Sequence, residues 1–516
     1  MLHLKGGSDY VCGRFFSLSL VALVGGFIAC EAIAEITLRP AGTFHTGLYD
    51  KSAAEIPTYC QKTKQVFVVN AESGRVDVLG LGDDGSLTKV GSIDAAGDLG
   101  NGMSAVNSVS VLDGTLAVAV EAGVITENGR VAFYDTGSLQ LKSSVEAGAL
   151  PDMVTFTPDG QWVLVANEGE PNEDYTIDPE GTVTVVDVRD GFDQPNTRTV
   201  TFRDWNSGGK HAKQLPELKK QGLRVFGQVS QSGDLKKKTP ATFAQDVEPE
   251  WIAVDHESHF AYVCLQEVNA VAEVDIADAT VRRIIPLGYK NFGEAGNGID
   301  ASDEDGRIDI HPRSGLFGIL QPDSIRIYQQ NGKRLLVTAN EGDSRVRPTS
   351  DDAVAGLEEG AIFEDEASLE DWPTAGTQFE KQTSDTELGR LKLVRDLVDD
   401  HLDEEGRPTQ LFAFGSRSFS IIDLTTGDTV FDSGDDFEQI TAQRFPEFFN
   451  VSNDSLIKEK RSRSKGPEPE GLVLGTVGEK TYAFIGLERI GGIMVYDITQ
   501  PESSKHVGYF NNRRFD

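Results

Sequence analysis

The sequence predicts an all-β protein, a β-propeller built from four-stranded blades. Six copies of one strand-rich unit follow each other along the 516 residues, short apolar runs alternate with Gly, Asp and Asn turns, and glycine is abundant at 54 residues. A repeat of roughly 40–50 residues with four antiparallel strands is typical of propellers. We expect one propeller domain over residues 35–516, with six blades recognisable in this chain.

The six copies share a spacing between two polar positions. Each copy starts at an acid or Asn, and its second strand ends at another, which lies 15, 14, 16, 17, 18 or 18 residues later in chain order. A third strand then ends in Asp, as in Gly181–Asp187, and a fourth strand follows. The paired positions are Glu55 and Asn70, Asn107 and Glu121, Asp152 and Glu168, Glu250 and Glu267, Asp323 and Glu341, and Glu470 and Glu488.

Two copies carry almost the same phrase after an apolar strand, Ala166–Glu170 and Ala339–Asp343. Each phrase is preceded by a Pro-Asp pair, Pro151-Asp152 or Pro322-Asp323. This order predicts an antiparallel hairpin with an acid before its first strand and another after its second strand. Such a hairpin places both carboxylates at the same end. A propeller gathers such ends around its axis, so the acids of different blades are predicted to converge.

Four long insertions interrupt the repeats, at about 203–247, 289–321, 344–410 and 433–467. Each follows a second or a fourth strand. Because consecutive strands reverse direction, these loops emerge on the same face as the acids. Elaborated loops on one rim of a rigid scaffold are where binding and catalytic residues usually lie. This face is therefore the predicted functional face.

Residues 1–34 are predicted to be an export signal outside the fold. Lys5 and Arg14 precede the apolar stretch Phe15–Ala29, and Ala32–Ala34 offers a cleavage site. The stretch is shorter than the ~20 residues of a spanning helix, so a membrane anchor is the weaker alternative. We expect a secreted protein (periplasmic, extracellular or at the cell surface) without a membrane span.

The charge balance limits the partners. A formal net charge of −34 excludes nucleic acid as an expected partner, since phosphates need a basic surface. The same charge suits an extracytoplasmic protein or one loaded with divalent cations. The sequence contains no P-loop, nucleophile elbow or His-Glu-x-x-His motif, and its eight histidines show no zinc spacing.

The converging acids form a predicted metal site. So many carboxylates cannot all stay ionised in one funnel without positive charge, and hard oxygen ligands select Ca²⁺ first, with Fe³⁺, Mg²⁺ or Mn²⁺ as further candidates. The alternative is that each acid accepts hydrogen bonds from backbone N–H groups of the next blade. The predicted axial ligands are Glu55, Asp152, Glu168, Glu250, Glu267, Asp323, Glu341, Asp343, Glu470 and Glu488.

A second candidate cation site is the acidic stretch Asp300–Asp309. Its closely spaced oxygen side chains, with Asp303 and Asp305 as ligands and Gly306 at the turn, resemble a Ca²⁺ loop. Ala301 stands where the first ligand is expected, so a plain acidic turn is the alternative.

Two arginines are the candidate catalytic residues. Arg345 follows the second copy of the repeated phrase and Arg489 follows Glu488. A guanidinium beside a metal cluster suits an oxyanion such as phosphate. The alternative is that both arginines only neutralise neighbouring carboxylates.

Five segments resemble the choice-of-anchor I propeller proteins: Leu150–Val154, Ala166–Pro171, Thr338–Asp343, Gly466–Gly471 and Gly486–Gly492. The resemblance covers nearly the whole chain after the export signal. It implies a secreted or surface-attached propeller, alkaline-phosphatase-like in some members and distantly similar to the PhoX type of calcium- and iron-dependent phosphatase. It also implies a further blade after Asn511-Asn512-Arg513, hence a seven-bladed ring in full-length relatives.

The functional expectation is a metal-dependent phosphoesterase acting on a small-molecule phosphoester. The metals would polarise the phosphoryl oxygen, and Arg345 or Arg489 would stabilise the developing charge. The rival is a non-catalytic cell-surface or matrix propeller with structural Ca²⁺ that binds an unknown surface ligand. A monomer is favoured, although the sequence leaves the oligomeric state open.

Overall fold

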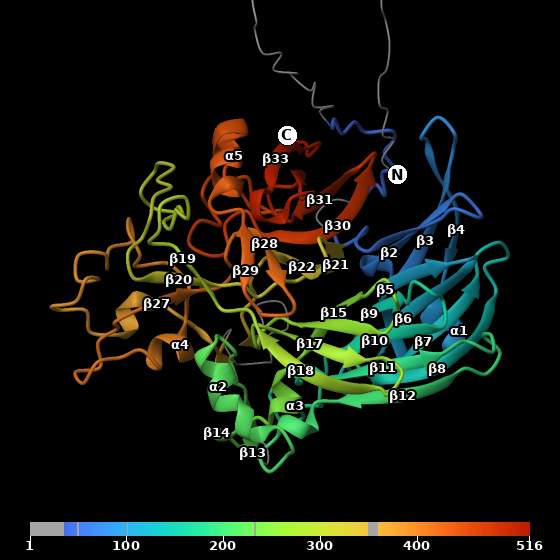
Figure 1. The fold of residues 1–516 in the computed structure, drawn as a ribbon, viewed down its shortest axis with the longest axis horizontal. Coiled ribbons are helices and arrows are strands. Elements are labelled where there is room, and N and C mark those ends of the chain that lie inside the picture. The colour runs from blue at the N-terminus through green and yellow to red at the C-terminus, as the bar shows by residue number, and fades with distance from the viewer. Residues whose placement is uncertain (1–35, 49–50, 101, 232–233, 349–359, 516) are drawn as a thin grey trace, which may run out of the picture.

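The protein is a β-propeller, as the sequence predicts. The computed structural model describes residues 36–48, 51–100, 102–231, 234–348 and 360–515. Within these ranges, six four-stranded antiparallel sheets are arranged as blades around a common axis (Figure 1). The predicted export signal, residues 1–34, lies outside the described residues.

In each blade the strands are hydrogen-bonded to their neighbours in chain order, and the first strand lies innermost. The strands of the six blades in turn are β1 (Pro57–Cys60), β2 (Gln65–Asn70), β3 (Arg75–Leu81) and β4 (Leu87–Ile93); β5 (Met103–Leu112), β6 (Thr115–Ala122), β7 (Asn128–Asp135) and β8 (Leu141–Ala149); β9 (Pro151–Phe156), β10 (Trp162–Asn167), β11 (Thr182–Asp187) and β12 (Asn196–Thr201); β15 (Pro249–Val254), β16 (Phe260–Leu265), β17 (Ala270–Asp275) and β18 (Thr280–Pro286); β21 (Ile325–Gln330), β22 (Lys333–Asn340), β28 (Ser418–Asp423) and β29 (Thr429–Asp432); β30 (Pro469–Val477), β31 (Lys480–Leu487), β32 (Ile493–Asp497) and β33 (Lys505–Phe510).

The hydrophobic core lies between the blades. Strand side chains alternate between the two faces of a sheet, and β6 shows the consequence. Leu116 and Val118 pack into a cluster with blade one, while Ala117 and Ala119 pack into another with blade three. Both faces of this blade are therefore buried, which explains why its second strand is an almost unbroken apolar run.

The start of the described chain packs against the last blade. Ile36 and Leu38 contact a cluster formed by Tyr482, Phe484 and Val495 of blade six. In Figure 1 this N-terminal segment lies between the sixth blade and the first. The seventh blade that the resemblance implies is not among the described residues and stays a prediction.

The insertions build structure beside the propeller. Segments from 289–321 and 344–410, together with β27, form a five-stranded sheet at the left of Figure 1, in which β20 and β27 run parallel. The 433–467 insertion carries α5. The elements outside the blades are α1 (Ala95–Leu99), α2 (Leu215–Lys220), β13 (Gln228–Gln231), β14 (Asp234–Pro240), α3 (Phe243–Asp246), β19 (Tyr289–Asn291), β20 (Leu316–Ile319), β23 (Val346–Arg347), β24 (Phe363–Glu364), β25 (Glu366–Ala367), β26 (Leu393–Val394), α4 (Arg395–Asp399), β27 (Leu411–Ala413), α5 (Asp436–Arg444) and short 3₁₀ turns at Ala71–Ser73, Arg203–Trp205, Ala212–Gln214, Leu369–Asp371, Pro446–Phe448 and Pro501–Ser503.

None of the helices in the described ranges has the length and apolar character needed to cross a membrane.

Arg224 ties two insertions to each other and to the axis. Its side chain is fully buried, and one terminal nitrogen, Nη2, lies 3.0 Å from Asp365 and 2.7 Å from Asp396 of the 344–410 insertion. The other, Nη1, donates to the backbone carbonyl of Glu267 at 3.2 Å. Through this arginine the insertions support the backbone that carries one of the predicted axial acids.

Replacing Arg224 should be strongly destabilising. Arg224→Ala leaves Asp365 buried without its partner, and breaking a buried ion pair in this way costs about 3–5 kcal/mol. The free energy of unfolding from denaturant titration measures the loss. Arg203→Ala is the control, because Arg203 forms an exposed pair with Glu180, and such pairs contribute at most about 1 kcal/mol. Equal losses in the two variants would contradict the anchoring role of Arg224.

Candidate functional site

A β-bulge places the first polar residue of several blades. In blade three the pairing passes from Asn167 opposite Pro151 to Ala166 opposite Met153, which leaves Asp152 outside the ladder. Bulges redirect side chains and are common beside functional sites. These side chains therefore do not follow the alternation that fills the core between blades. The same irregularity surrounds Asn107, Glu250 and Glu470.

A left-handed residue stands two positions before the first acid in four blades. These residues are not glycine, although a positive φ is uncommon for any residue with a Cβ atom and such backbone strain clusters at functional sites. The carbonyl of Leu150 accepts a hydrogen bond from the N–H of Glu168 at 3.0 Å, and that of Glu468 accepts from Glu488 at 2.9 Å. The turn thus joins the two acid-bearing ends of a blade. The four residues are Leu150, Glu248, Gln321 and Glu468, with φ of 47°, 34°, 42° and 52°.

The repeated Ala-Asn-Glu-Gly phrase has a structural role in its Asn and its Gly. Asn167 donates to the hydroxyl of Thr184 at 3.0 Å, and Asn340 donates to that of Ser420 at 2.8 Å, so each Asn fastens the second strand to the third. Gly342 has φ of 89°, and a Cβ atom there would lie 2.2 Å from a backbone nitrogen. These two residue types leave the Glu between them free to point away from the blade.

Four carboxylates from blades three and four form a first cluster, and in the described part of the chain none of them forms an ion pair: Asp152, Glu168, Glu250 and Glu267. Burial is the first cause of a raised pKa in each, and it raises the pKa of Asp152 to about 7 and that of Glu267 to about 8. Neighbouring carboxylates add to burial, since Asp152 raises the pKa of Glu168 and Glu267 raises that of Glu250. Each of these acids thus has another carboxylate near enough to raise its pKa, and their joint role as metal ligands stays a prediction.

Two oxygens of this cluster lack hydrogen-bond donors within the described residues. Glu267 is only 7% exposed, yet its Oε2 has no partner, and neither has Oε2 of Glu250. The backbone-capping alternative predicts donors from the next blade at these oxygens, and within the described residues none is present. The one cation that acts strongly on Glu267 is Arg345, which is already paired with other acids.

A second cluster, from blades five and six, contains its own cations. Oxygen atoms of Glu341, Glu468 and Glu488 lie within 4.8 Å of one another, a spacing that suits a shared ion. Lys465 Nζ lies 2.6 Å from Glu341, and Arg489 Nε lies 2.9 Å from both Glu468 and Glu488. Burial opposes the charge of Lys465, but the carboxylates around it hold its pKa above the usual value.

The remaining predicted ligands lie beside these clusters. Burial raises the pKa of Asp323 well above its usual value and that of Glu470 to about 7, with Glu341 as the next cause for both. Asp343 is half-buried and lies 3.3 Å from the ammonium of Lys465. Glu55 is exposed, and it contributes to the site by raising the pKa of Asp152.

The two predicted catalytic arginines differ in their surroundings. Arg345 is 4% exposed, and its terminal nitrogens lie 2.8 Å from Asp246 and 2.7 Å from Glu248. Arg489 is 23% exposed at its side chain and lies beside the second cluster. Arg345 therefore links Asp246 to Glu248 by ion pairs, while Arg489 is the more accessible of the two arginines. A catalytic role for either stays a prediction.

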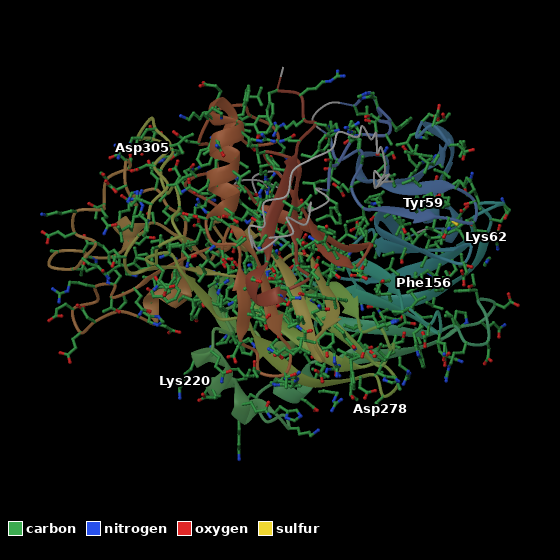
Figure 2. All side chains as sticks on the ribbon, turned by 45° about the horizontal axis from the view of Figure 1, so that its top comes forward. Tyr59, Lys62, Phe156, Lys220, Asp278 and Asp305 are labelled. Carbon is green, nitrogen blue, oxygen red and sulfur yellow. The ribbon has the colours of Figure 1, made fainter. Side chains whose placement is uncertain are left out.

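The acidic stretch around Asp303 and Asp305 lies away from the axis. Figure 2 places Asp305 at the periphery, on the side of the five-stranded sheet. Asp303 accepts a hydrogen bond from Arg390 at 2.8 Å and lies 3.2 Å from Arg463 Nε in an ion pair, and Arg307 lies 3.6 Å from Asp305. Guanidinium groups thus stand where the Ca²⁺-loop interpretation puts an ion, and that interpretation stays a prediction.

Sequence reasoning missed two residues of the second cluster. Glu468 lies two positions before Glu470, just before the first strand of its blade, where the sequence suggests only a structural role. Lys465 lies at the end of a long insertion, where the repeat pattern gives no information. Their signal is the short segment Lys465–Glu470, in which Lys465 and Glu468 both belong to the cluster and lie 3.9 Å apart.

One family model matches most of this chain, and two curated proteins match parts of it. The sequence profile of the choice-of-anchor I domain matches residues 55–501. A mesenchyme-specific cell surface glycoprotein of Strongylocentrotus purpuratus is 30% identical over 296 residues, which are 53% of this chain and 38% of that protein. Gigasin-3a of Magallana gigas is 34% identical over 97 residues, 18% of this chain and 34% of that protein. The chain spans less than half the length of these relatives.

Among solved structures, the β-propeller domain of Cps50 (Swd1) from Myceliophteria thermophila resembles the chain with a TM-score of 0.33 and 8% identity, covering 84% of this chain and 94% of that one. The propeller assignment rests on the six sheets described above.

The buried carboxylates predict an unusual pH dependence of stability. The pKa of a carboxyl group in the unfolded chain is ~4. In the folded protein, burial raises the pKa of Asp152 to about 7 and that of Glu267 to about 8. The folded state therefore binds more protons in this window, so the free energy of unfolding of the metal-free protein should fall as the pH rises from about 5 to about 8. Denaturant titrations with a chelator present measure this fall.

A matched pair of variants assigns the effect. Glu267→Gln keeps the shape of the protonated side chain, and it should reduce the fall by about 1 kcal/mol or more. The exposed Glu479→Gln should leave the profile unchanged. A metal-free protein that gains stability from about pH 5 to about pH 8 would show that the acids are not buried as described.

Proposed function

The chain belongs to the choice-of-anchor I domain family, and we propose that it is a secreted or cell-surface β-propeller that binds divalent cations, Ca²⁺ first, through its axial carboxylates. The extracellular setting is supported by the sea-urchin relative, which is a cell surface glycoprotein. The predicted export signal and the acidic composition are in keeping with it.

The observation that carries the proposal is the cluster of Asp152, Glu168, Glu250 and Glu267. These side chains come from two neighbouring blades, and within the described residues Oε2 of Glu250 and Oε2 of Glu267 have no hydrogen-bond donor. Buried charges in proteins are paired or coordinate metals. A cation is a partner that all four carboxylates could share. The packing of the core does not require the bulges and turns that position these acids, so they are in keeping with a role in binding.

The chemistry of the donors selects the ion. All four donors are carboxylates, and hard oxygen ligands favour Ca²⁺, Mg²⁺, Mn²⁺ or Fe³⁺ over metals that need nitrogen or sulfur. Ca²⁺ accepts six to eight oxygens in flexible geometry, so it tolerates ligands that come from separate blades. Glu341, Glu468 and Glu488 would hold a further ion in competition with Lys465.

In this proposal the cation completes the acidic face. Arg224 joins two insertions to the carbonyl of Glu267, and Arg345 joins Asp246 of one insertion to Glu248 at the entry of blade four. An ion on Glu267 would therefore steady the rim on which a partner binds. This is the role of a non-catalytic surface propeller, in which metal binding shapes a recognition surface.

Calcium should stabilise the protein and a chelator should destabilise it. A ligand that binds only the folded state at about 100 times its Kd adds about 2.7 kcal/mol to the free energy of unfolding. Thermal unfolding with Ca²⁺, Mg²⁺ or chelator, together with elemental analysis of the purified protein, measures this gain.

The variant Glu250→Gln with Glu267→Gln should abolish the gain, and Glu479→Gln should retain it. A wild-type protein that contains no metal, and whose unfolding ignores both Ca²⁺ and chelator, would refute the metal site.

A metal-dependent phosphoesterase is the second candidate function. Arg489 favours it, because this guanidinium lies against Glu468 and Glu488 and its side chain is 23% exposed. An ion at the cluster would polarise a phosphoryl oxygen, and Arg489 would then donate to the non-bridging oxygens. Arg345 is less suited to that role, since Asp246 and Glu248 occupy its guanidinium.

Hydrolysis of an aryl phosphate tests the second candidate. Turnover should require Ca²⁺, alone or with iron, and stop with chelator. Arg489→Gln should lower kcat by roughly 10²–10³, the usual cost of removing one donor to the developing charge, while the exposed Arg203→Gln should leave it unchanged. A metal-loaded protein with stabilising Ca²⁺ and no turnover would exclude the phosphoesterase and leave the recognition role.

A further inference from the structure

The side of the propeller opposite the carboxylates carries a basic pocket. Its volume is about 430 Å³, and it lies between blades four and five. Phe260 begins β16 there, whereas Glu267 follows the other end of the same strand. Figure 2 labels Asp278 in the neighbouring β17–β18 turn, at the edge of the molecule. The lining side chains include Phe260, Tyr262, Glu273, Arg282, Arg283 and Arg334.

Three arginines in one pocket are unexpected in a chain of net charge −34. One of them is satisfied internally, since Arg283 donates to Glu273 at 2.8 and 3.1 Å and to the carbonyl of Leu424. The other two, Arg282 and Arg334, line the pocket and have N–H groups that donate no hydrogen bond within the described residues. Tyr262 also donates to Glu273, at 3.3 Å, so this single buried acid already has its partners.

Arg282 and Arg334 keep unpaired N–H groups. The Nε atom of Arg282 lies 3.7 Å from Glu273, beyond hydrogen-bond distance, and its side chain is 50% exposed. Arg334 donates one hydrogen bond, to the Tyr262 hydroxyl at 2.9 Å, and lies 3.7 Å from Asp255. A guanidinium carries five N–H donors, so both side chains have donors left within the described structure.

The ring of Phe260 contacts both of these guanidinium groups. The guanidinium carbon of Arg282 lies 4.7 Å from the ring centroid and that of Arg334 lies 5.4 Å from it. Cation–π contacts of this kind orient arginines at little hydrogen-bonding cost. The ring thus presents two positive charges together, and less side-chain freedom is lost when an anion binds.

Blade three contains a similar arrangement in which both arginines already have partners. Trp162 stands where Phe260 stands, and Arg189 and Arg198 lie over its ring at 4.6 and 5.1 Å. There Arg189 is paired with Asp187, and Arg198 donates to two carbonyls of blade four. The arrangement in blade three is structural, whereas in blade four the donors remain open beside a cavity.

We propose that this pocket binds a tetrahedral oxyanion, a sulfate or phosphate group, between Arg282 and Arg334. Guanidinium groups match such oxyanions with paired hydrogen bonds. The group is either a free ion or part of a sulfated glycan of the extracellular surroundings. The site is separate from the carboxylate face, so it does not depend on the proposed metal binding.

Titration of the full chain with sodium sulfate, followed by calorimetry, tests the site. Wild type should show saturable binding that weakens with added NaCl, as screening requires. Arg282→Gln should weaken it about tenfold or more, the value of one charged hydrogen-bond donor, and Arg282→Lys should weaken it less. Arg189→Gln is the matched control, because this arginine also lies on an aromatic ring but is already paired.

The control should bind sulfate as wild type does, and equal melting temperatures without sulfate establish that each variant folds. A sulfated disaccharide that binds more tightly than sulfate, beside an unsulfated one that does not bind, identifies a glycan as the source. Equal affinities identify the free ion. Absence of saturable binding, or unchanged binding in Arg282→Gln, overturns the proposal.

Discussion

Crowding of carboxylates around one axis is the constraint on which the rest of this structure depends. Each acid loses hydration on burial and repels its neighbours, so the ionised forms need compensation. The protein supplies it unevenly. Blades five and six receive Lys465 and Arg489 from insertions and strand ends, whereas Asp152, Glu168 and Glu250 form no ion pair within the described residues. Protons or metal ions must balance that half.

The backbone is shaped to keep the acids together despite this repulsion. The bulges at Asp152, Glu250 and Glu470 release these side chains from the sheet alternation. The left-handed residues before them join the two ends of each hairpin. Such strain persists where surrounding structure over-determines it, and here the buried inter-blade core does so.

The blades and the spacing of the acids can be predicted from the sequence, because both depend on local patterns. The spacing between paired acids follows from the length of a hairpin, and the blades follow from alternating apolar runs and turns. The partners of the acids depend instead on long-range contacts. Lys465 and Glu341 are separated by 124 residues in the sequence, and Arg345 and Glu248 by 97. The neighbouring sequence therefore does not predict either pair. The bulges were hidden for another reason: they lie at the start of the first strand of a blade, so the alternation of the residues that follow is unchanged.

The bulges also separate the chemistry of the axis from the packing of the blades. A residue outside the ladder contributes little to the core, so its identity can change while the scaffold stays the same. Blade two illustrates the point, because Asn107 occupies the bulge there and donates to Glu121 and to the carbonyl of Pro151 in the next blade. A neutral or an acidic residue at such a position therefore leaves the strand pairing of its blade in place. The number of charges that face the axis is thereby set separately from the hydrogen bonding of the blades.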